Sequence, residues 1–147
     1  MDLEFMLATL EDKDTSKAFE VLKELEKMSD DVNALYPYID KFIEMIHSEK
    51  YVIRVRGFRL FCKQAKWDVD GVIDRNLEDA LNILNDKKPT AVRQALAALK
   101  ELVLYKKELN KLVKERALAI DYYRYKDTMH SLISKDIEAL LAVMKEN

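Results

Sequence analysis

The segment that decides the fold of this chain is AVRQALAALKEL, residues 91–102. Its apolar residues recur three and four positions apart, a spacing that places them along one face of an α-helix. They are Ala91, Val92, Ala95, Leu96, Leu99 and Leu102. Pro89 stands just before the segment, and proline is favoured as the first residue of a helix. We therefore expect a helix from Pro89 to about Leu104.

The same pattern occurs elsewhere in the chain at a nearly constant distance. The pair Val55-Arg56 lies 37 residues before Val92-Arg93, and LKEL at 22–25 recurs at 99–102, about two such steps later. A period of this size indicates stacked helical hairpins, because one hairpin is too small to bury its own apolar face.

Helical spacing of apolar residues extends over nearly the whole chain, and strict alternation is absent. We therefore predict an all-α domain of eight helices separated by short polar breaks. They lie near residues 2–11, 15–28, 31–46, 50–66, 72–84, 89–104, 109–120 and 127–147. Pro37 falls within 31–46, which predicts either a late start or a kink of the third helix. The helices pair into four hairpins within a single domain, 1–147, with approximate bounds 1–29, 30–67, 68–105 and 106–147.

Residues 91–102, behind the turn NDKKP at 85–89, resemble the second helix of a HEAT repeat, in which a Val-Arg pair precedes a helix of Leu and small residues. Segment 48–65 is similar but bulkier, with Phe58 and Phe61 in place of alanine, and the first and last hairpins lack the Val-Arg pair. The resemblance implies a short right-handed α-α superhelix, or solenoid, of about four HEAT-like hairpins. It also implies that the second helices line a concave face that binds macromolecules, without a reaction.

The composition agrees with a helical domain and excludes other classes. The 147 residues, 49% hydrophobic and 35% charged, suffice for one well-cored domain. Two glycines and two prolines are too few for a strand-rich fold, and Gly-rich phosphate loops and nucleophile elbows need glycines that the chain lacks. Abundant Lys, Glu and Arg with two Gln give a weak thermophile signal.

The location is inferred from features that the sequence lacks. It shows no secretory leader and no run of 18 apolar residues, and its one cysteine cannot form an internal disulfide. We therefore expect a cytoplasmic protein that does not contact a membrane.

A net charge of −2 conceals segments of opposite sign. Residues 50–67 carry six basic residues and no acid, and residues 87–116 carry nine basic residues against three acids. Superposition of the repeats places Arg56 over Arg93 and Lys63 over Lys100, so basic residues form two columns on or beside the concave face. Arg59 and Lys66 extend the basic face of the fourth helix.

Three interpretations of these basic columns are open. The cations could pair with acids of neighbouring helices, for which Asp40, Glu44, Asp74, Glu78 and Asp86 are close in the repeat. Alternatively, Arg59, Lys63, Lys66 and Lys100 could be unpaired and form a groove for nucleic-acid phosphates or for an acidic peptide. The third interpretation is a solvated face without a role.

A second candidate surface is the aromatic and basic run Tyr122, Tyr123, Arg124 and Tyr125. Aromatic rings among cations can stack on bases, and the same residue types suit protein recognition. The structural alternative is that Tyr122 and Tyr125 pack under the last helix.

Residues with catalytic chemistry are scattered. Cys62 lies on an apolar helix face, which predicts a buried, inert thiol, and His47 and His130 lie in different hairpins without partners at ligand spacing. HEAT-like stacks include DNA glycosylases for alkylated bases, and Trp67 beside Asp68 invites that comparison, but no motif of that group is present. We therefore expect no catalytic residue, cofactor or metal.

Together these observations predict a non-catalytic HEAT-like scaffold or adaptor that binds a protein or peptide on its concave face. The alternative is a nucleic-acid-binding module that uses the basic columns of the fourth and sixth helices. The first and last helices are rich in apolar residues, so self-association through an end is also open.

Overall fold

The computed structural model describes residues 2–145, and within this range the chain is all-helical and forms no strand. The eight α-helices are α1 (Leu3–Thr9), α2 (Thr15–Asp31), α3 (Ile39–Ile46), α4 (Tyr51–Lys63), α5 (Val72–Ala80), α6 (Pro89–Tyr105), α7 (Asn110–Leu118) and α8 (Asp127–Lys145). Five 3₁₀ turns join them: η1 (Tyr36–Tyr38), η2 (Gln64–Trp67), η3 (Leu81–Asn85), η4 (Lys107–Leu109) and η5 (Tyr122–Arg124). For residues 2–145, the prediction of an all-α fold with eight helices is confirmed.

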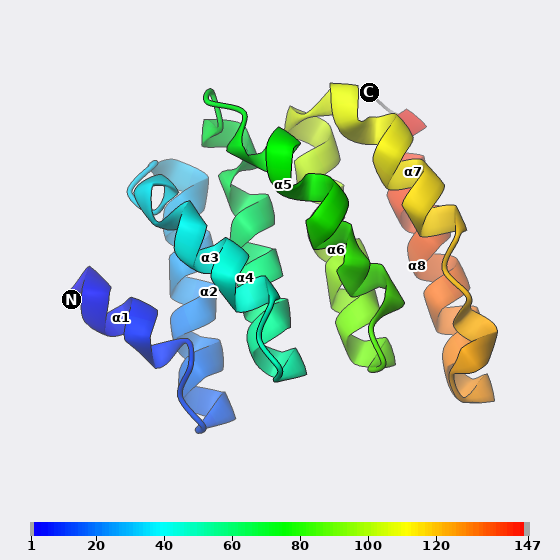
Figure 1. The fold of residues 1–147 in the computed structure, drawn as a ribbon, viewed down its shortest axis with the longest axis horizontal. Coiled ribbons are helices and arrows are strands. Elements are labelled where there is room, and N and C mark those ends of the chain that lie inside the picture. Colours follow the sequence, from blue (N-terminus) through cyan, green and yellow to red (C-terminus); the bar gives the residue numbers. More distant parts are fainter. Residues whose placement is uncertain (1, 146–147) are drawn as a thin grey trace.

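The helices form two layers (Figure 1). Helices α1, α3, α5 and α7 lie in the front layer. Behind them stand α2, α4, α6 and α8, which we call the even helices, side by side and running in the same direction. Helix α4 packs against α2, α3 and α6, and α6 packs against α8. Each even helix therefore packs against the even helix that follows it in the chain.

One hydrophobic core runs between the two layers. Phe42 of α3 and Phe58 and Phe61 of α4 are fully buried in it. Three pairs of positions 37 residues apart in α4 and α6 are buried as well, namely Val55 and Val92, Phe58 and Ala95, and Cys62 and Leu99. The apolar faces that the helical spacing predicts are therefore the faces that pack.

Helix starts follow local sequence rules. Asp2 and Asp14 cap α1 and α2 with their carboxylates, which accept hydrogen bonds from the backbone N–H groups of Glu4 and Lys17. Pro89 occupies the first turn of α6, as expected.

The third helix starts later than residue 31, which is one of the two outcomes that Pro37 predicts for this stretch. Helix α2 continues to Asp31, and α3 begins at Ile39. Pro37 lies between them in the short turn η1, where its missing N–H and fixed φ are tolerated. The apolar spacing of 35–46 was correct, but proline moved the start of the helix beyond itself.

Gly57 lies where α3 and α4 approach most closely. A Cβ at this position would lie 2.6 Å from Met45 Cβ and 2.7 Å from the carbonyl oxygen of Phe42. The carbonyl belongs to the backbone of α3, so it cannot yield without moving that helix. Glycine inside α4 is therefore a packing requirement.

Asp68, in the turn after α4, joins three parts of the chain. Its carboxylate accepts hydrogen bonds from the backbone N–H groups of Val72 and Ile73 at the start of α5 and from the Tyr36 hydroxyl, and Lys106 Nζ lies 3.2 Å from Oδ2. Burial by itself would raise the pKa of Asp68, but the hydrogen bonds, first those from Tyr36 and Ile73, outweigh burial and lower it. This turn is therefore tied to both the preceding and the following hairpin.

Asp86 lies in the turn before α6. It accepts hydrogen bonds from Arg54 Nε at 2.8 Å and from the backbone N–H of Lys88 at 2.9 Å. Asp86 therefore links α4 to the start of α6. Within the described range, no helix is both long and apolar enough to cross a membrane.

Candidate functional site

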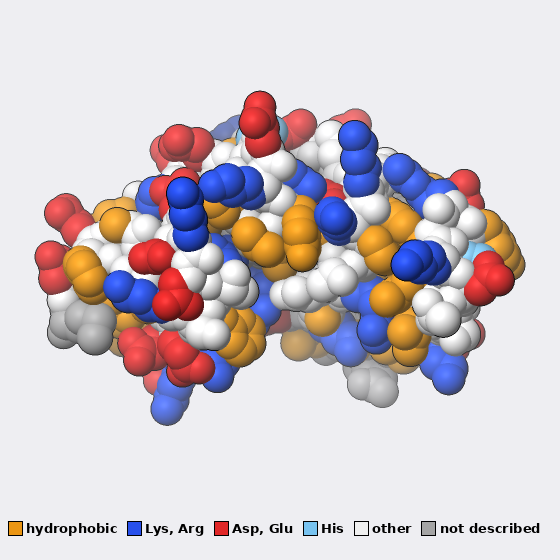
Figure 2. Space-filling view, turned by 90° about the horizontal axis from the view of Figure 1, so that it is seen from below, with side chains coloured by type: hydrophobic (Ala, Val, Ile, Leu, Met, Phe, Trp, Pro, Cys, Tyr) orange, Lys and Arg blue, Asp and Glu red, His pale blue; other side chains and the backbone are white. Residues whose placement is uncertain are grey.

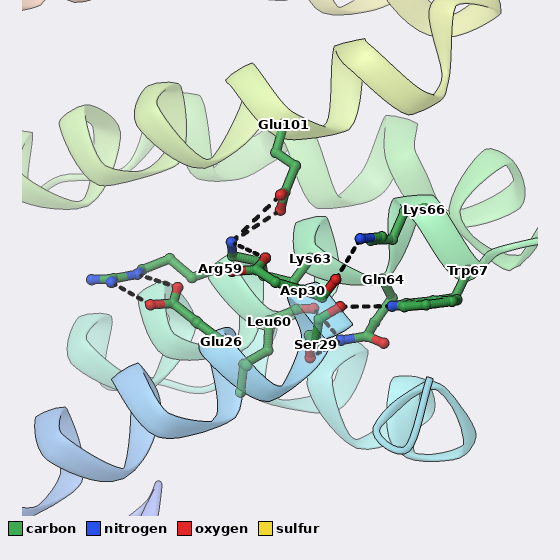
Figure 3. A network of polar contacts seen from close by, with 10 residues as sticks. All are labelled: Glu26, Ser29, Asp30, Arg59, Leu60, Lys63, Gln64, Lys66, Trp67 and Glu101. Atoms are coloured by element: carbon green, nitrogen blue, oxygen red, sulfur yellow. Dashed lines mark hydrogen bonds and ion pairs between the residues drawn. The ribbon is translucent and has the colours of Figure 1, made fainter. Parts of the chain in front are cut away.

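The basic side of α4 is bound to the acidic side of α2 (Figure 3). Arg59 forms a two-pronged ion pair with Glu26, with N–O distances of 2.9 and 2.8 Å, and donates a third hydrogen bond to Gln94 of α6. Lys63 Nζ lies 2.8 Å from Asp30 and 3.3 Å from Glu101. Two of the predicted binding cations are therefore partnered within the chain.

The last turn of α2 is also held by α4 and η2 (Figure 3). Lys66 Nζ donates to the carbonyl of Asp30 at 2.5 Å, and Trp67 Nε1 donates to the carbonyl of Ser29 at 2.8 Å. Such carbonyls at a helix C-terminus lack partners in their own helix and favour a nearby cation. The positive charge of Lys66 in η2 thus compensates the C-terminal end of α2.

Burial and pairing act on the ionisable groups in this network. Burial by itself would lower the pKa of Lys63, but the hydrogen bond to Asp30 and the charge of Glu101 outweigh it and raise the pKa. Burial, with a smaller effect of the charges of Glu101 and Glu26, raises the pKa of the Cys62 thiol well above its usual range. Cys62 is therefore a weak nucleophile, which agrees with the predicted inert thiol.

The two arginines of the Val-Arg pairs bind different neighbours. Arg56 is 5% exposed, and its Nη1 donates to the carbonyl of Leu10 at 2.7 Å. Arg93 pairs with Asp136 of α8 at 2.7 Å. Both arginines of the predicted column are therefore engaged within the chain, one with the end of α1 and the other with α8.

The acids that were expected to neutralise the columns have other roles. Asp86 pairs with Arg54, and Asp74 pairs with Lys106 at 2.7 Å. The pairing interpretation is correct for Arg59, Lys63 and Arg93, but their partners come from the even helices.

A hollow of about 520 Å³ lies on the even-helix side between α4 and α6. We call it the α4–α6 groove. Its lining consists of Glu26, Arg59, Cys62, Lys63, Gln94, Ala97, Ala98, Lys100, Glu101, Leu104 and Val143. Figure 2, which looks along the helices, shows the even-helix side at the bottom, indented between two lobes.

Lys100 differs from the other cations of the groove. Within residues 2–145 it has no hydrogen bond, ion pair or ring contact, and it is half-buried in α6. The structure thus brings together Arg59, Lys63 and Lys100, of which the first two are neutralised. Lys66, Arg56 and Arg93 lie outside the lining.

The aromatic run Tyr122–Tyr125 lies apart from the groove, at the connection before α8. Tyr122 and Tyr125 pack against the core, and Tyr125 donates to the carbonyl of Asp86. Arg124 donates to the carbonyl of Asn85 at 3.1 Å, whereas Tyr123 is 71% exposed. Tyr122 and Tyr125 therefore have the structural role that was the alternative.

The residues that suggested chemistry are distributed over the fold. Trp67 and Asp68 bind the end of α2 and the start of α5, as described above, and neither lines the groove. Within the described range, no three His, Cys, Asp or Glu side chains are placed to hold a metal ion.

The end helices bury much of the apolar surface that suggested self-association. Met6 and Leu7 of α1 and Ile133 and Leu140 of α8 are buried. Phe5 remains exposed on α1.

Sequence reasoning missed most of the groove lining. The α6 residues Gln94, Ala97, Ala98, Glu101 and Leu104 form an i, i+3, i+4, i+7, i+10 series beside the buried stripe. The spacing could have identified them as one face. The groove is open at this face because two of these side chains are small alanines, and alanine is an ordinary residue in a helix.

No protein-family model, no curated protein and no solved structure matches this chain. The function is therefore inferred from the geometry of the groove.

Proposed function

We propose that this chain is a non-catalytic HEAT-like scaffold that binds a protein or peptide partner in the α4–α6 groove. In this proposal the four hairpins form a short right-handed superhelix, and the even helices line its concave side. Three facts support it: the even helices run in one direction, consecutive ones pack together, and three pairs of apolar positions 37 residues apart in α4 and α6 are buried in both helices.

The observation that carries the proposal is the character of the groove. Ala97 and Leu104 are exposed on α6, and Leu104 is 41% accessible. At the margins, the charges of Arg59 and Lys63 are already matched by carboxylates. An open hollow with apolar contacts and few unmatched charges suits a protein surface, because apolar area then supplies affinity.

The nucleic-acid alternative receives less support from the same contacts. Protein cations that bind phosphates gain affinity by releasing the counterions of the nucleic acid, but an ion-paired cation must first leave its carboxylate. Such ion pairs are formed by Arg59, Lys63 and Arg93. The alternative predicts retention on heparin or DNA at low salt that Arg59→Glu with Lys63→Glu abolishes, and the proposal predicts no such retention.

A peptide-binding assay tests the proposal directly. A phage-displayed peptide library is panned on the protein, and enriched peptides are resynthesised with a fluorescein label for polarisation titrations. Ala97→Trp fills the groove from an exposed helical position and should weaken binding at least tenfold. Ala8→Trp, at an exposed position of α1 outside the groove, is the matched control and should bind as the wild type does.

Circular dichroism and thermal melting establish that both variants remain folded. Peptides that bind Ala97→Trp and wild type equally would overturn the proposal, as would a library that yields no binder.

A further inference from the structure

The α4–α6 groove follows the axis of α6. The lining residues of α6 run from Gln94 to Leu104, a span of about 15 Å at 1.5 Å per residue. On α4 the lining residues are Arg59, Cys62 and Lys63, which lie on a single turn. The groove is therefore about three helical turns long.

The lining favours one mode of peptide recognition. Added strands need a sheet edge with unpaired backbone groups, and polyproline segments need aromatic walls. The described groove residues come from helices, and no aromatic ring is among them. An α-helix laid into the groove fits walls that are themselves helices, and the small side chains of Ala97 and Ala98 permit close approach of its axis.

The charges determine what this helix carries. Arg59 has two bonds to Glu26 and one to Gln94, and Lys63 lies between Asp30 and Glu101. These cations are satisfied before a partner binds. Lys100 remains without a partner within residues 2–145, and an ammonium without an internal partner forms a charge-assisted hydrogen bond with an incoming carboxylate.

Apolar contacts flank this ammonium on the same helix. Ala97 lies one turn before Lys100 and Leu104 one turn after it, and both are exposed. A partner helix that packs on both Ala97 and Leu104 therefore places one of its own side chains, between these two contacts, near Lys100.

We infer that the groove binds an amphipathic α-helix of about three turns that places one Asp or Glu on Lys100 and apolar residues on Ala97 and Leu104. This inference rests on the proposed function and adds the class of the partner and the residue that selects it. Lys100 acts as the specificity residue because the other groove cations are neutralised inside the chain.

A charge exchange tests the inference. The same library is panned in parallel on wild type and on Lys100→Glu. Groove-dependent peptides from the wild type should be helical, with one acidic residue between two apolar ones. Replacement of that residue by Asn or Gln should weaken binding about tenfold, and Lys100→Arg should retain binding.

The decisive experiment combines the Lys100→Glu variant with a peptide in which Lys replaces the acidic residue. Lys100→Glu should lose the original peptide and recover binding to the exchanged one. Lys111→Glu, at an exposed lysine of α7 outside the groove, is the matched control and should change neither affinity.

Two results would overturn the inference while leaving the proposed function intact. One is a set of peptides that Ala97→Trp excludes but that carry no acidic residue. The other is equal binding of the acidic peptide to wild type and Lys100→Glu. Displacement of the peptide by single-stranded DNA at low salt would instead favour the polyanion alternative and overturn both.

Discussion

Helices α4 and α6 carry the same Val-Arg pair, and the two arginines end in different surroundings. Arg56 is buried and donates to the carbonyl of Leu10, whereas Arg93 is partly exposed and pairs with Asp136. The helices that lie next to α4 and α6 make this difference, since the motif is identical. A repeated motif therefore fixes a position on a helix but not the partner of the side chain.

The remaining cations of the two helices differ in the same way. Helix α4 stands between α2 and α6, whose carboxylates bind Arg59 and Lys63. On α6, Lys100 forms no ion pair within residues 2–145. The more basic helix is thus the neutralised one, and net charge along the sequence is a poor guide to the charge available for binding.

The largest effect is expected from the position where the two helices differ most in packing. Gly57 of α4 corresponds to Gln94 of α6 by the offset of 37 residues. Gly57→Ala places a methyl group 2.7 Å from the Phe42 carbonyl oxygen and should destabilise the protein by about 2 kcal/mol, because the strain exceeds the gain in helix propensity. Urea unfolding measures the change.

Gln94→Ala is the matched control and should cost less than about 1 kcal/mol, because Gln94 is half-exposed and loses one hydrogen bond. Equal stability of Gly57→Ala and wild type would contradict the close approach of α3 and α4.

A smaller effect separates the two arginines. Arg56→Met removes the donor to the Leu10 carbonyl and should destabilise the protein by about 1 kcal/mol. Arg93→Met breaks a partly exposed ion pair and should change stability by less than about 0.5 kcal/mol. Unfolding curves at low and high salt distinguish them, since salt should reduce the Arg93 effect alone. A salt-dependent Arg56 effect would argue against its buried position.

The smallest effect concerns α3 and α5, which lie in front of α4 and α6. His47 binds the carbonyl of Ile43 and the carboxylate of Asp79, and these contacts raise its pKa above the 6.5 of a free histidine. Because the folded pKa is the higher one, this stabilisation is complete below about pH 6.5 and is lost as the pH rises through the folded value. Tm measured between about pH 5.5 and about pH 8.5 should therefore fall slightly, and His47→Gln should flatten that slope. An unchanged slope in the variant would assign the pH dependence to other groups.

Much of the fold could be predicted, and the reasons are local. Helical spacing identified the buried faces, and Pro89 identified the start of α6, because both depend on neighbouring residues in the chain. The start of α3 could not be placed in the same way. Its apolar spacing begins before Pro37, but proline confines that stretch to a 3₁₀ turn.

The candidate site was predicted in part. Arg59, Lys63 and Lys100 were selected from the sequence and do line one groove. Arg56 could not be separated from them, because its burial depends on where the Leu10 carbonyl lies. Ala97 and Leu104 carried no signal of their own.

The sequence by itself determined that this chain is helical, where its apolar faces lie and which segments carry charge. Those properties depend on spacing along a backbone of fixed geometry, and spacing can be counted in a sequence. The tertiary structure decided which cations are neutralised, why Gly57 is required and where the groove opens. These depend on atoms that are distant along the chain and that folding brings together, such as those of Gly57 and Phe42 or of Lys63 and Asp30.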